Sequence, residues 1–104
     1  MGTRVSWSPE AIDDVDTLAA YISKDSPYYA SAVVKKILDT ADSLGKFPYI
    51  GPIVPEIGEQ EFRERFVYSY RLIYRVIDEE VLVVAVIHGR RLLDPILDRF
   101  DGSA

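Results

Sequence analysis

The feature that most constrains this sequence is the apolar run Val81–Ile87, in which seven consecutive residues carry no polar side chain. Most of them are β-branched, and a short run of this kind is typical of a strand that is buried on both faces. The run is far too short to cross a bilayer, which requires roughly 20 apolar residues. Polar side chains return directly after it, at His88, Arg90 and Arg91. The sequence therefore predicts a central strand with polar chemistry at its end.

Length and composition are those of an ordinary globular domain. With 104 residues, 48% hydrophobic and 28% charged, we expect one domain over 1–104, with a core at about 3–93 and a tail at 94–104. The absence of cysteine excludes disulfides, thiolate nucleophiles and cysteine–zinc sites. The N-terminal residues lack the apolar segment of a signal peptide, so a cytoplasmic location without a membrane partner is expected.

Two amphipathic helices are predicted in the first half of the chain. Each follows a Ser-Pro pair, Ser8-Pro9 and Ser26-Pro27, in which serine caps the helix and proline takes the first helical position. Apolar residues then recur at helical spacing over about 9–24 and 27–44. Because only a few residues separate the two segments, we expect an antiparallel helical hairpin.

Strands surround this hairpin in the sequence. A short strand is predicted at 4–7, and three more at 62–67, 70–77 and 81–88, after a loop at 46–60 that is rich in proline and glycine. The three later strands are joined by short turns and should form an antiparallel meander. The predicted fold class is α+β in the order β-α-α-β-β-β, with the hairpin packed on one face of a small, mainly antiparallel sheet.

The strand at 70–77 separates arginine from apolar side chains. Side chains alternate along a strand, so Arg71 and Arg75 share one face. The other face carries the apolar set that should contact the helices, namely Tyr70, Leu72, Tyr74 and Val76. We therefore expect Arg71 and Arg75 on the opposite, open face of the sheet.

The turn at residues 68–69 decides which side chains join these arginines. A two-residue turn places Glu64 and Phe66 on the face of Arg71, whereas a three-residue turn places Arg63 and Arg65 there. Tyr-Ser is a poor sequence for a tight hairpin turn, so both registers stay open, with a slight preference for the two-residue turn.

Charge is distributed unevenly along the chain. The net charge is −5, which disfavours non-specific binding to nucleic acid, yet residues 63–93 hold six arginines against four acidic residues. Arginine is suited to planar recognition of phosphate or carboxylate. His88 is the only histidine, which excludes a site with two histidine ligands, and the aspartates at 13, 14 and 16 are explained by the positive end of a helix. We expect neither a metal nor another cofactor.

Five short motifs occur in order along the chain and together are fairly specific. They are Val5-Ser6-Trp7-Ser8-Pro9-Glu10-Ala11, Phe47-Pro48-Tyr49-Ile50-Gly51, Arg63-Glu64, Tyr70-Arg71-Leu72-Ile73-Tyr74-Arg75-Val76 and Ile87-His88-Gly89-Arg90-Arg91. With these motifs the chain resembles the RelE/ParE superfamily of toxins from type II toxin–antitoxin pairs, over roughly residues 3–93. The resemblance implies a helical hairpin packed on a small antiparallel sheet.

The sequence is more similar to the ParE branch of that superfamily than to the RelE branch. The resemblance implies a plasmid-stabilisation-like toxin that inhibits growth by binding a target protein such as DNA gyrase, rather than by chemistry of its own. The alternative is a RelE-like ribosome-dependent mRNA endoribonuclease without a metal, for which Arg71, Arg90 and Arg91 would be catalytic candidates. The strand lysines and the C-terminal tyrosine of that branch have no counterpart here. A third possibility is a non-toxic antitoxin-binding module.

The resemblance also implies roles for particular residues. The expected target-binding residues are Arg71, Arg75, His88, Arg90 and Arg91. The structural alternative is that an arginine of this set is buried and pairs with Glu64 or Asp78.

A cognate antitoxin is the partner that the resemblance implies, as a segment that folds onto the toxin as a helix and often adds a strand. Its candidate contacts are the aromatic residues Tyr28, Tyr29, Phe66 and Tyr68. In the tail, Ile96, Leu97 and Phe100 are expected to form a short closing turn or helix, or to become ordered only with a partner.

Overall fold

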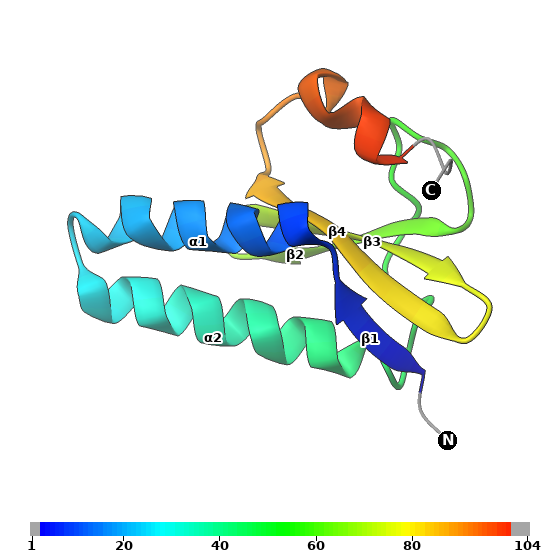
Figure 1. Cartoon of the computed structure of the whole chain (residues 1–104), viewed down its shortest axis with the longest axis horizontal. Coiled ribbons are helices and arrows are strands. Elements are labelled where there is room, and N and C mark those ends of the chain that lie inside the picture. The colour runs from blue at the N-terminus through cyan, green and yellow to red at the C-terminus, as the bar shows by residue number, and fades with distance from the viewer. Residues whose placement is uncertain (1–2, 101–104) are drawn as a thin grey trace.

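The computed structural model describes residues 3–100 and confirms the predicted fold class and order of elements (Figure 1). The elements are β1 (Arg4–Trp7), α1 (Pro9–Ser23), α2 (Pro27–Ser43), β2 (Phe62–Val67), β3 (Tyr70–Ile77), β4 (Glu80–His88) and the 3-10 helix η1 (Asp94–Phe100). Residues 101–104 of the predicted tail lie outside the described residues. No helix within residues 3–100 is both long and apolar enough to cross a membrane.

Both helices begin at the predicted Ser-Pro pairs. The Ser8 hydroxyl accepts a hydrogen bond from the Ala11 N–H at 3.1 Å, and the Ser26 hydroxyl accepts one from the Tyr29 N–H at 3.0 Å. These bonds satisfy N–H groups that no helical carbonyl can reach, and each such cap is worth about 1 kcal/mol. The two helices lie side by side as the predicted hairpin (Figure 1).

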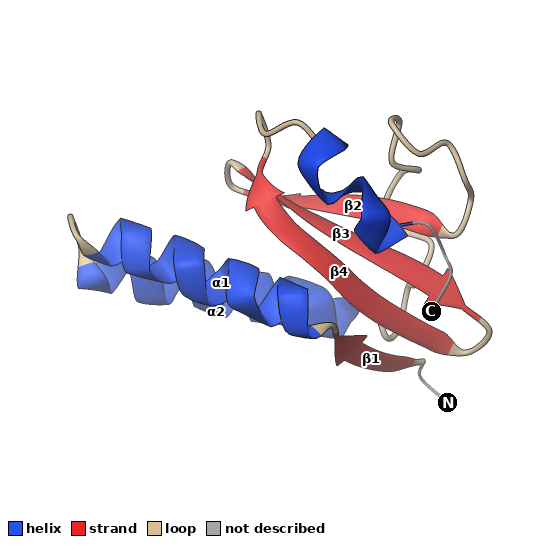
Figure 2. Cartoon of the chain, turned by 45° about the horizontal axis from the view of Figure 1, so that its top comes forward, coloured by secondary structure: helices blue, strands red, loops and turns tan. Residues whose placement is uncertain are grey.

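The four strands form one mixed sheet in the order β1-β4-β3-β2. β2, β3 and β4 make the predicted antiparallel meander, and β1 pairs with β4 in parallel. Figure 2 shows β4 between β1 and β3. The apolar run Val81–Ile87 is therefore a central strand, as its composition predicts.

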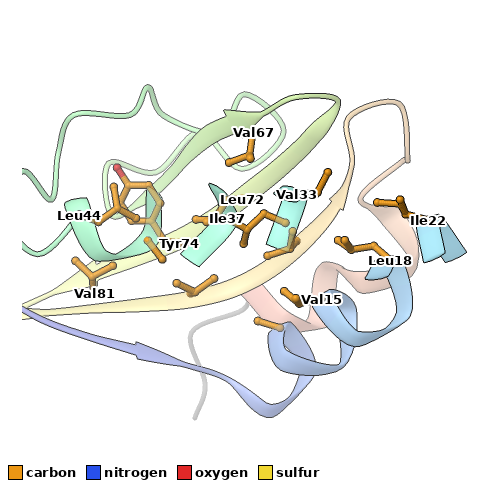
Figure 3. Packing of buried hydrophobic residues seen from close by; sticks show 14 of the residues in the cluster. Val15, Leu18, Ile22, Val33, Ile37, Leu44, Val67, Leu72, Tyr74 and Val81 are labelled. Carbon is orange, nitrogen blue, oxygen red and sulfur yellow. The ribbon is translucent and has the colours of Figure 1, made fainter. Parts of the chain in front are cut away.

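The helical hairpin covers one face of this sheet. Figure 3 shows Val15, Leu18 and Ile22 of α1 and Val33 and Ile37 of α2 in one cluster with side chains of the strands. The predicted apolar face of β3 lies in this cluster, with Leu72 and Tyr74 fully buried. Burial of each large apolar side chain contributes about 1.5–3 kcal/mol, so this layer is a main source of the stability of the fold.

The opposite face of the sheet is not open, and the expectation that Arg71 and Arg75 point to an open face was wrong. A second apolar cluster covers it, formed by Ile73 and Ile87 of the strands, Val54 of the loop, and residues in and near η1. The rings of Phe62 and Phe100 meet edge to face, with their centres 5.8 Å apart. In Figure 2, η1 lies in front of the strands. Because β4 is apolar on both faces, each face must be packed against other residues. The helices pack on one face, and η1 with its neighbouring residues packs on the other.

The tail residues are therefore ordered within the described chain. Ile96 and Phe100 are buried, whereas Leu97 is 43% exposed. The predicted short closing helix is confirmed as η1.

A two-residue turn at Tyr68-Ser69 sets the register of β2 and β3, so the favoured alternative is confirmed. Val67 lies opposite Tyr70, and Phe66 lies opposite Arg71. Tyr68 has a φ of 54°, in the left-handed region that tight hairpin turns require. This strained conformation is retained because a shift of the register by one residue would turn Val67 out of the core.

A β-bulge interrupts the alternation of side chains in β4. Ile73 pairs with Ala85 but Tyr74 pairs with Val83, so Val84 has no partner in β3. Bulges of this kind bend a strand and redirect its polar groups. The Val84 carbonyl is therefore free to accept hydrogen bonds from other elements.

Arg99 of η1 joins three elements at this bulge. Its Nη1 donates to the Val84 carbonyl at 3.2 Å and to Asp14 Oδ2 of α1 at 2.7 Å. Asp14 Oδ2 also accepts the N–H of Val86 at 3.0 Å, and the Ser8 hydroxyl reaches the Val84 carbonyl at 3.4 Å. The pair Asp14–Arg99 thus fixes η1 against both α1 and β4.

Candidate functional site

Arg71 is buried on the sheet face that η1 covers, and two carboxylates hold it. Its Nε donates to Glu64 Oε1 at 2.8 Å, and its Nη1 and Nη2 donate to the two oxygens of Glu56 at 2.8 and 3.0 Å. The side chains of Arg71 and Glu64 are only 6% and 8% exposed, whereas Glu56 is 43% exposed. The structural alternative of a buried arginine paired with Glu64 is therefore the arrangement present, and Asp78 is not its partner.

Ion pairing shifts the pKa of Arg71 and the pKa of Glu56. The hydrogen bonds that Arg71 donates to Glu56, together with those that it donates to Glu64, raise the pKa of Arg71 above its usual value. The hydrogen bonds from Arg71 lower the pKa of Glu56 below its usual value. By formal charge, this cluster of one arginine and two glutamates is negative.

Glu56 is a residue of this site that sequence reasoning missed. It lies in the irregular loop, where no periodicity indicates the direction of a side chain. The loop is nevertheless fixed, because the Gly51 N–H donates to the Tyr74 hydroxyl at 3.1 Å and Arg63 Nη1 donates to the Gly51 carbonyl at 3.2 Å. A Cβ at Gly51 would lie 2.2 Å from the Glu64 carbonyl oxygen, so only glycine allows this approach. The sequence feature that could have indicated a fixed loop is Gly51, which ends the motif Phe47-Pro48-Tyr49-Ile50-Gly51.

Arg75 is also engaged on the covered face. Its Nε donates to Glu61 Oε2 at 2.6 Å, and its guanidinium carbon lies 5.2 Å from the centre of the Phe62 ring. The Arg75 side chain is 23% exposed. Thus neither arginine of β3, Arg71 or Arg75, is presented to solvent as an isolated cation.

The turn after β4 presents its polar groups to solvent. His88, Arg90 and Arg91 are all exposed. The Gly89 N–H donates to the Ser69 carbonyl at 2.7 Å, and the Arg91 N–H donates to the His88 carbonyl at 2.9 Å. These bonds fix the backbone of the turn while leaving both guanidinium groups at the surface.

Next to this turn lies part of the predicted aromatic set. A pocket of about 580 Å³ is lined by Phe66, Tyr68, His88 and Arg90, together with their neighbours. The ring of Tyr68 lies 6.3 Å from that of Tyr29 at the start of α2.

The aromatic candidates are exposed to different degrees. Tyr29, Phe66 and Tyr68 are 48–59% exposed, and Tyr28 is 86% exposed. Their role as antitoxin contacts stays a prediction.

The predicted target-binding residues therefore fall into two groups. His88, Arg90 and Arg91 share the exposed turn, whereas Arg71 and Arg75 of β3 are engaged in ion pairs. Among the described residues, no group of three or more histidine, cysteine, aspartate or glutamate side chains could hold a metal ion.

Comparison with known proteins identifies the chain. Residues 5–93 match the family described as ParE toxin of type II toxin-antitoxin system, parDE. The fold and the match define a toxin of the type II toxin–antitoxin class. Within that class, the chain belongs to the ParE toxin family.

Individual relatives agree with this assignment. A protein of Sinorhizobium fredii (strain NBRC 101917 / NGR234) named "Putative toxin Y4kP" is 38% identical over 48 residues, which are 46% of this chain and 50% of that protein. The match thus spans about half the length of this curated relative.

Two solved structures share the fold. One is the chromosomal ParDE toxin–antitoxin system from P. aeruginosa, with a TM-score of 0.68 and 18% identity, covering 83% of this chain and 95% of that chain. The other is a YoeB dimer from Staphylococcus aureus, with a TM-score of 0.59 and 18% identity, covering 85% and 98%.

Proposed function

We propose that this toxin inhibits growth by binding a target protein through the exposed turn after β4, and that it does not cleave RNA. DNA gyrase is the target that the resemblance to ParE toxins implies. The observation that carries the proposal is that some arginines are held in ion pairs while others are exposed. Arg71 is bound by two carboxylates, while Arg90 and Arg91 are exposed at a fixed turn.

The ion pairs of Arg71 argue against a nuclease centred on it. Catalysis of phosphodiester cleavage requires positive groups positioned where negative charge develops. Here Glu56 and Glu64 surround the guanidinium, so a scissile phosphate would meet a cluster with net negative charge. The net charge of −5 for the chain also opposes approach to the dense phosphate surface of a ribosome.

The exposed turn is better suited to protein recognition. Arginine is enriched at protein interfaces, and here it stands beside exposed aromatic side chains of Phe66 and Tyr68. The backbone of the turn is fixed by Gly89 and Ser69, which limits the entropy lost when a partner binds.

A cognate antitoxin is the second partner that we propose. The ParDE complex is a fold neighbour, and antitoxin binding is the property that defines the class. The aromatic residues Tyr28, Tyr29, Phe66 and Tyr68 remain the proposed contacts. Tyr29 and Tyr68 come from α2 and from the β2–β3 turn, so one bound segment could cover both elements.

The test uses the purified chain in two assays. We expect inhibition of plasmid supercoiling by gyrase, with trapped cleavage complexes, and no cleavage of mRNA on translating ribosomes. The double variant R90Q/R91Q should lose inhibition while its melting temperature stays unchanged. R4Q is the matched control. Arg4 is exposed and lies opposite Glu80 at the start of β4, far along the strand from the turn that follows His88, and it makes only a surface ion pair with Glu80.

Other outcomes would overturn the proposal. Ribosome-dependent mRNA cleavage would establish the RelE-like alternative. Neither activity, together with no growth arrest when the chain is expressed without its neighbouring open reading frame, would leave a non-toxic antitoxin-binding module.

A further inference from the structure

A second pocket, of about 500 Å³, lies between α1, the end of β4 and the segment that leads to η1. We call it the α1–β4 pocket. Leu18 and Val86 are its buried apolar residues, and Tyr21, Tyr70 and His88 add aromatic lining. The positive side chains that line it are Arg91 and Arg99. The pocket therefore combines an apolar surface with cationic groups at its border.

Only one of its two arginines is uncompensated within the described chain. Arg99 is bound to both oxygens of Asp14, with N–O distances of 2.7 and 3.3 Å. Arg91 is exposed and makes no ion pair with any carboxylate of residues 3–100. The α1–β4 pocket thus offers a single positive charge to a ligand.

Two further hydrogen-bond donors, His88 and Tyr70, lie beside this charge. His88 Nδ1 accepts the Arg90 N–H at 3.2 Å, so Nε2 carries a ring proton and can donate. The ring of Tyr70 meets that of His88 edge to face at 5.8 Å. Burial raises the pKa of Tyr70, so its hydroxyl stays protonated and can also donate.

We propose that the α1–β4 pocket binds one carboxylate side chain of a partner protein, flanked by an apolar residue. A carboxylate carries one charge and pairs with an arginine through two parallel hydrogen bonds. The neighbouring apolar residue would cover Leu18 and Val86. This inference rests on the proposed function, because it assumes that the toxin works by binding proteins.

A phosphate ligand fits the same pocket less well. Phosphate monoesters carry close to two negative charges at neutral pH, and the pocket supplies one free cation beside the carboxylate of Asp14. The acidic balance of the whole chain adds to this mismatch. A single carboxylate is the ligand whose charge the pocket compensates.

The test is a titration of the full chain, followed by NMR, with the blocked tripeptide acetyl-Leu-Glu-Phe-amide. His88 is the only histidine, so its ring signals report on this region without ambiguity. We expect saturable shifts of the His88 and Tyr70 ring signals and of the Arg91 side-chain N–H. The matching peptide acetyl-Leu-Gln-Phe-amide should bind about tenfold more weakly, because it lacks the charge.

Two variants locate the binding. R91Q should weaken binding of the Glu peptide by about tenfold, since the charge-assisted hydrogen bonds are lost. R4Q is the matched control and should leave binding unchanged, because Arg4 does not line the pocket and makes only a surface ion pair with Glu80. Both residues are exposed, so neither change should disturb the fold.

Several results would overturn the inference. They are equal binding of the Glu and Gln peptides, unchanged binding to R91Q, tighter binding of inorganic phosphate or AMP than of the Glu peptide, and no saturable shift up to about 10 mM peptide. The titration contains neither gyrase nor an antitoxin. Its failure would therefore remove the carboxylate site while the supercoiling and growth assays still decide the proposed function.

Discussion

The replacement of Arg71 by methionine tests whether this arginine is primarily structural. Methionine retains much of the apolar stem but removes the guanidinium, leaving the Glu64 carboxylate buried at 8% exposure without its partner. Removing one member of a buried ion pair costs about 3–5 kcal/mol. That is a large part of the roughly 5–15 kcal/mol that stabilises a domain of this size. The melting temperature should fall by about 12–20 °C.

The second half of the test removes both charges. In R71M/E64L the buried pair is replaced by apolar side chains, a change that is often neutral or stabilising. Glu56 loses its partner in this variant, but its side chain is 43% exposed and can be hydrated, so the added cost should stay under about 1 kcal/mol. We expect the double variant to be more stable than R71M.

Urea denaturation followed by circular dichroism measures these differences. R75M is the matched control, because Arg75 lies on the same strand and pairs with Glu61, but the two side chains are 23% and 34% exposed. Its cost should be about 1 kcal/mol. The reasoning is refuted if R71M loses less than about 1 kcal/mol, if R75M loses as much as R71M, or if R71M/E64L is no more stable than R71M.

Three further perturbations address the loop, the bulge and pH. G51A should lower the free energy of unfolding by about 1–3 kcal/mol in urea titrations, because the new Cβ would lie 2.2 Å from the Glu64 carbonyl oxygen. D14N should speed hydrogen exchange at the Val86 amide and in η1, since the carboxylate that accepts from both elements loses its charge. Glu56 has a lowered pKa, so its contribution is present above its unfolded value of about 4.5 and is lost as pH falls through the folded value. The stability difference between the wild type and E56Q should therefore exist at pH 7 and disappear in acid.

Each of these expectations has a contrary result. Wild-type stability of G51A would mean that the loop moves without cost. If hydrogen exchange in η1 is unchanged in D14N, apolar packing alone holds η1 in place. D13N is the control, because Asp13 is an exposed neighbour on α1. A difference between the wild type and E56Q that grows in acid would contradict the direction of the Glu56 pKa shift.

The sequence was sufficient for the elements, their order and the antiparallel meander because those depend on local patterns, whereas the parallel pairing of β1 with β4 was not predicted. Ser8 and Ser26 mark helix starts by a chemistry confined to a few neighbouring residues. The run Val81–Ile87 predicted a buried strand, whereas the register at Tyr68-Ser69 stayed open in the sequence and only the structure decides it.

The site was less predictable because it depends on segments without periodicity. Glu56 reaches Arg71 from an irregular loop, and Asp14 meets Arg99 across most of the chain. The cover of the second face was missed for a related reason. Ile96 and Phe100 lie in a short 3-10 helix whose few apolar residues do not form a stripe that sequence reading can recognise.

The parallel pairing of β1 with β4 has a consequence for synthesis of the toxin. Arg4 lies opposite Glu80, and Trp7 opposite Val83, so β1 cannot pair until β4 has been synthesised. Contacts between such distant segments form late. A nascent chain that stalls before β4 lacks a central strand of the sheet, and β1 then has no strand to pair with. Toxicity should therefore require translation to have passed β4.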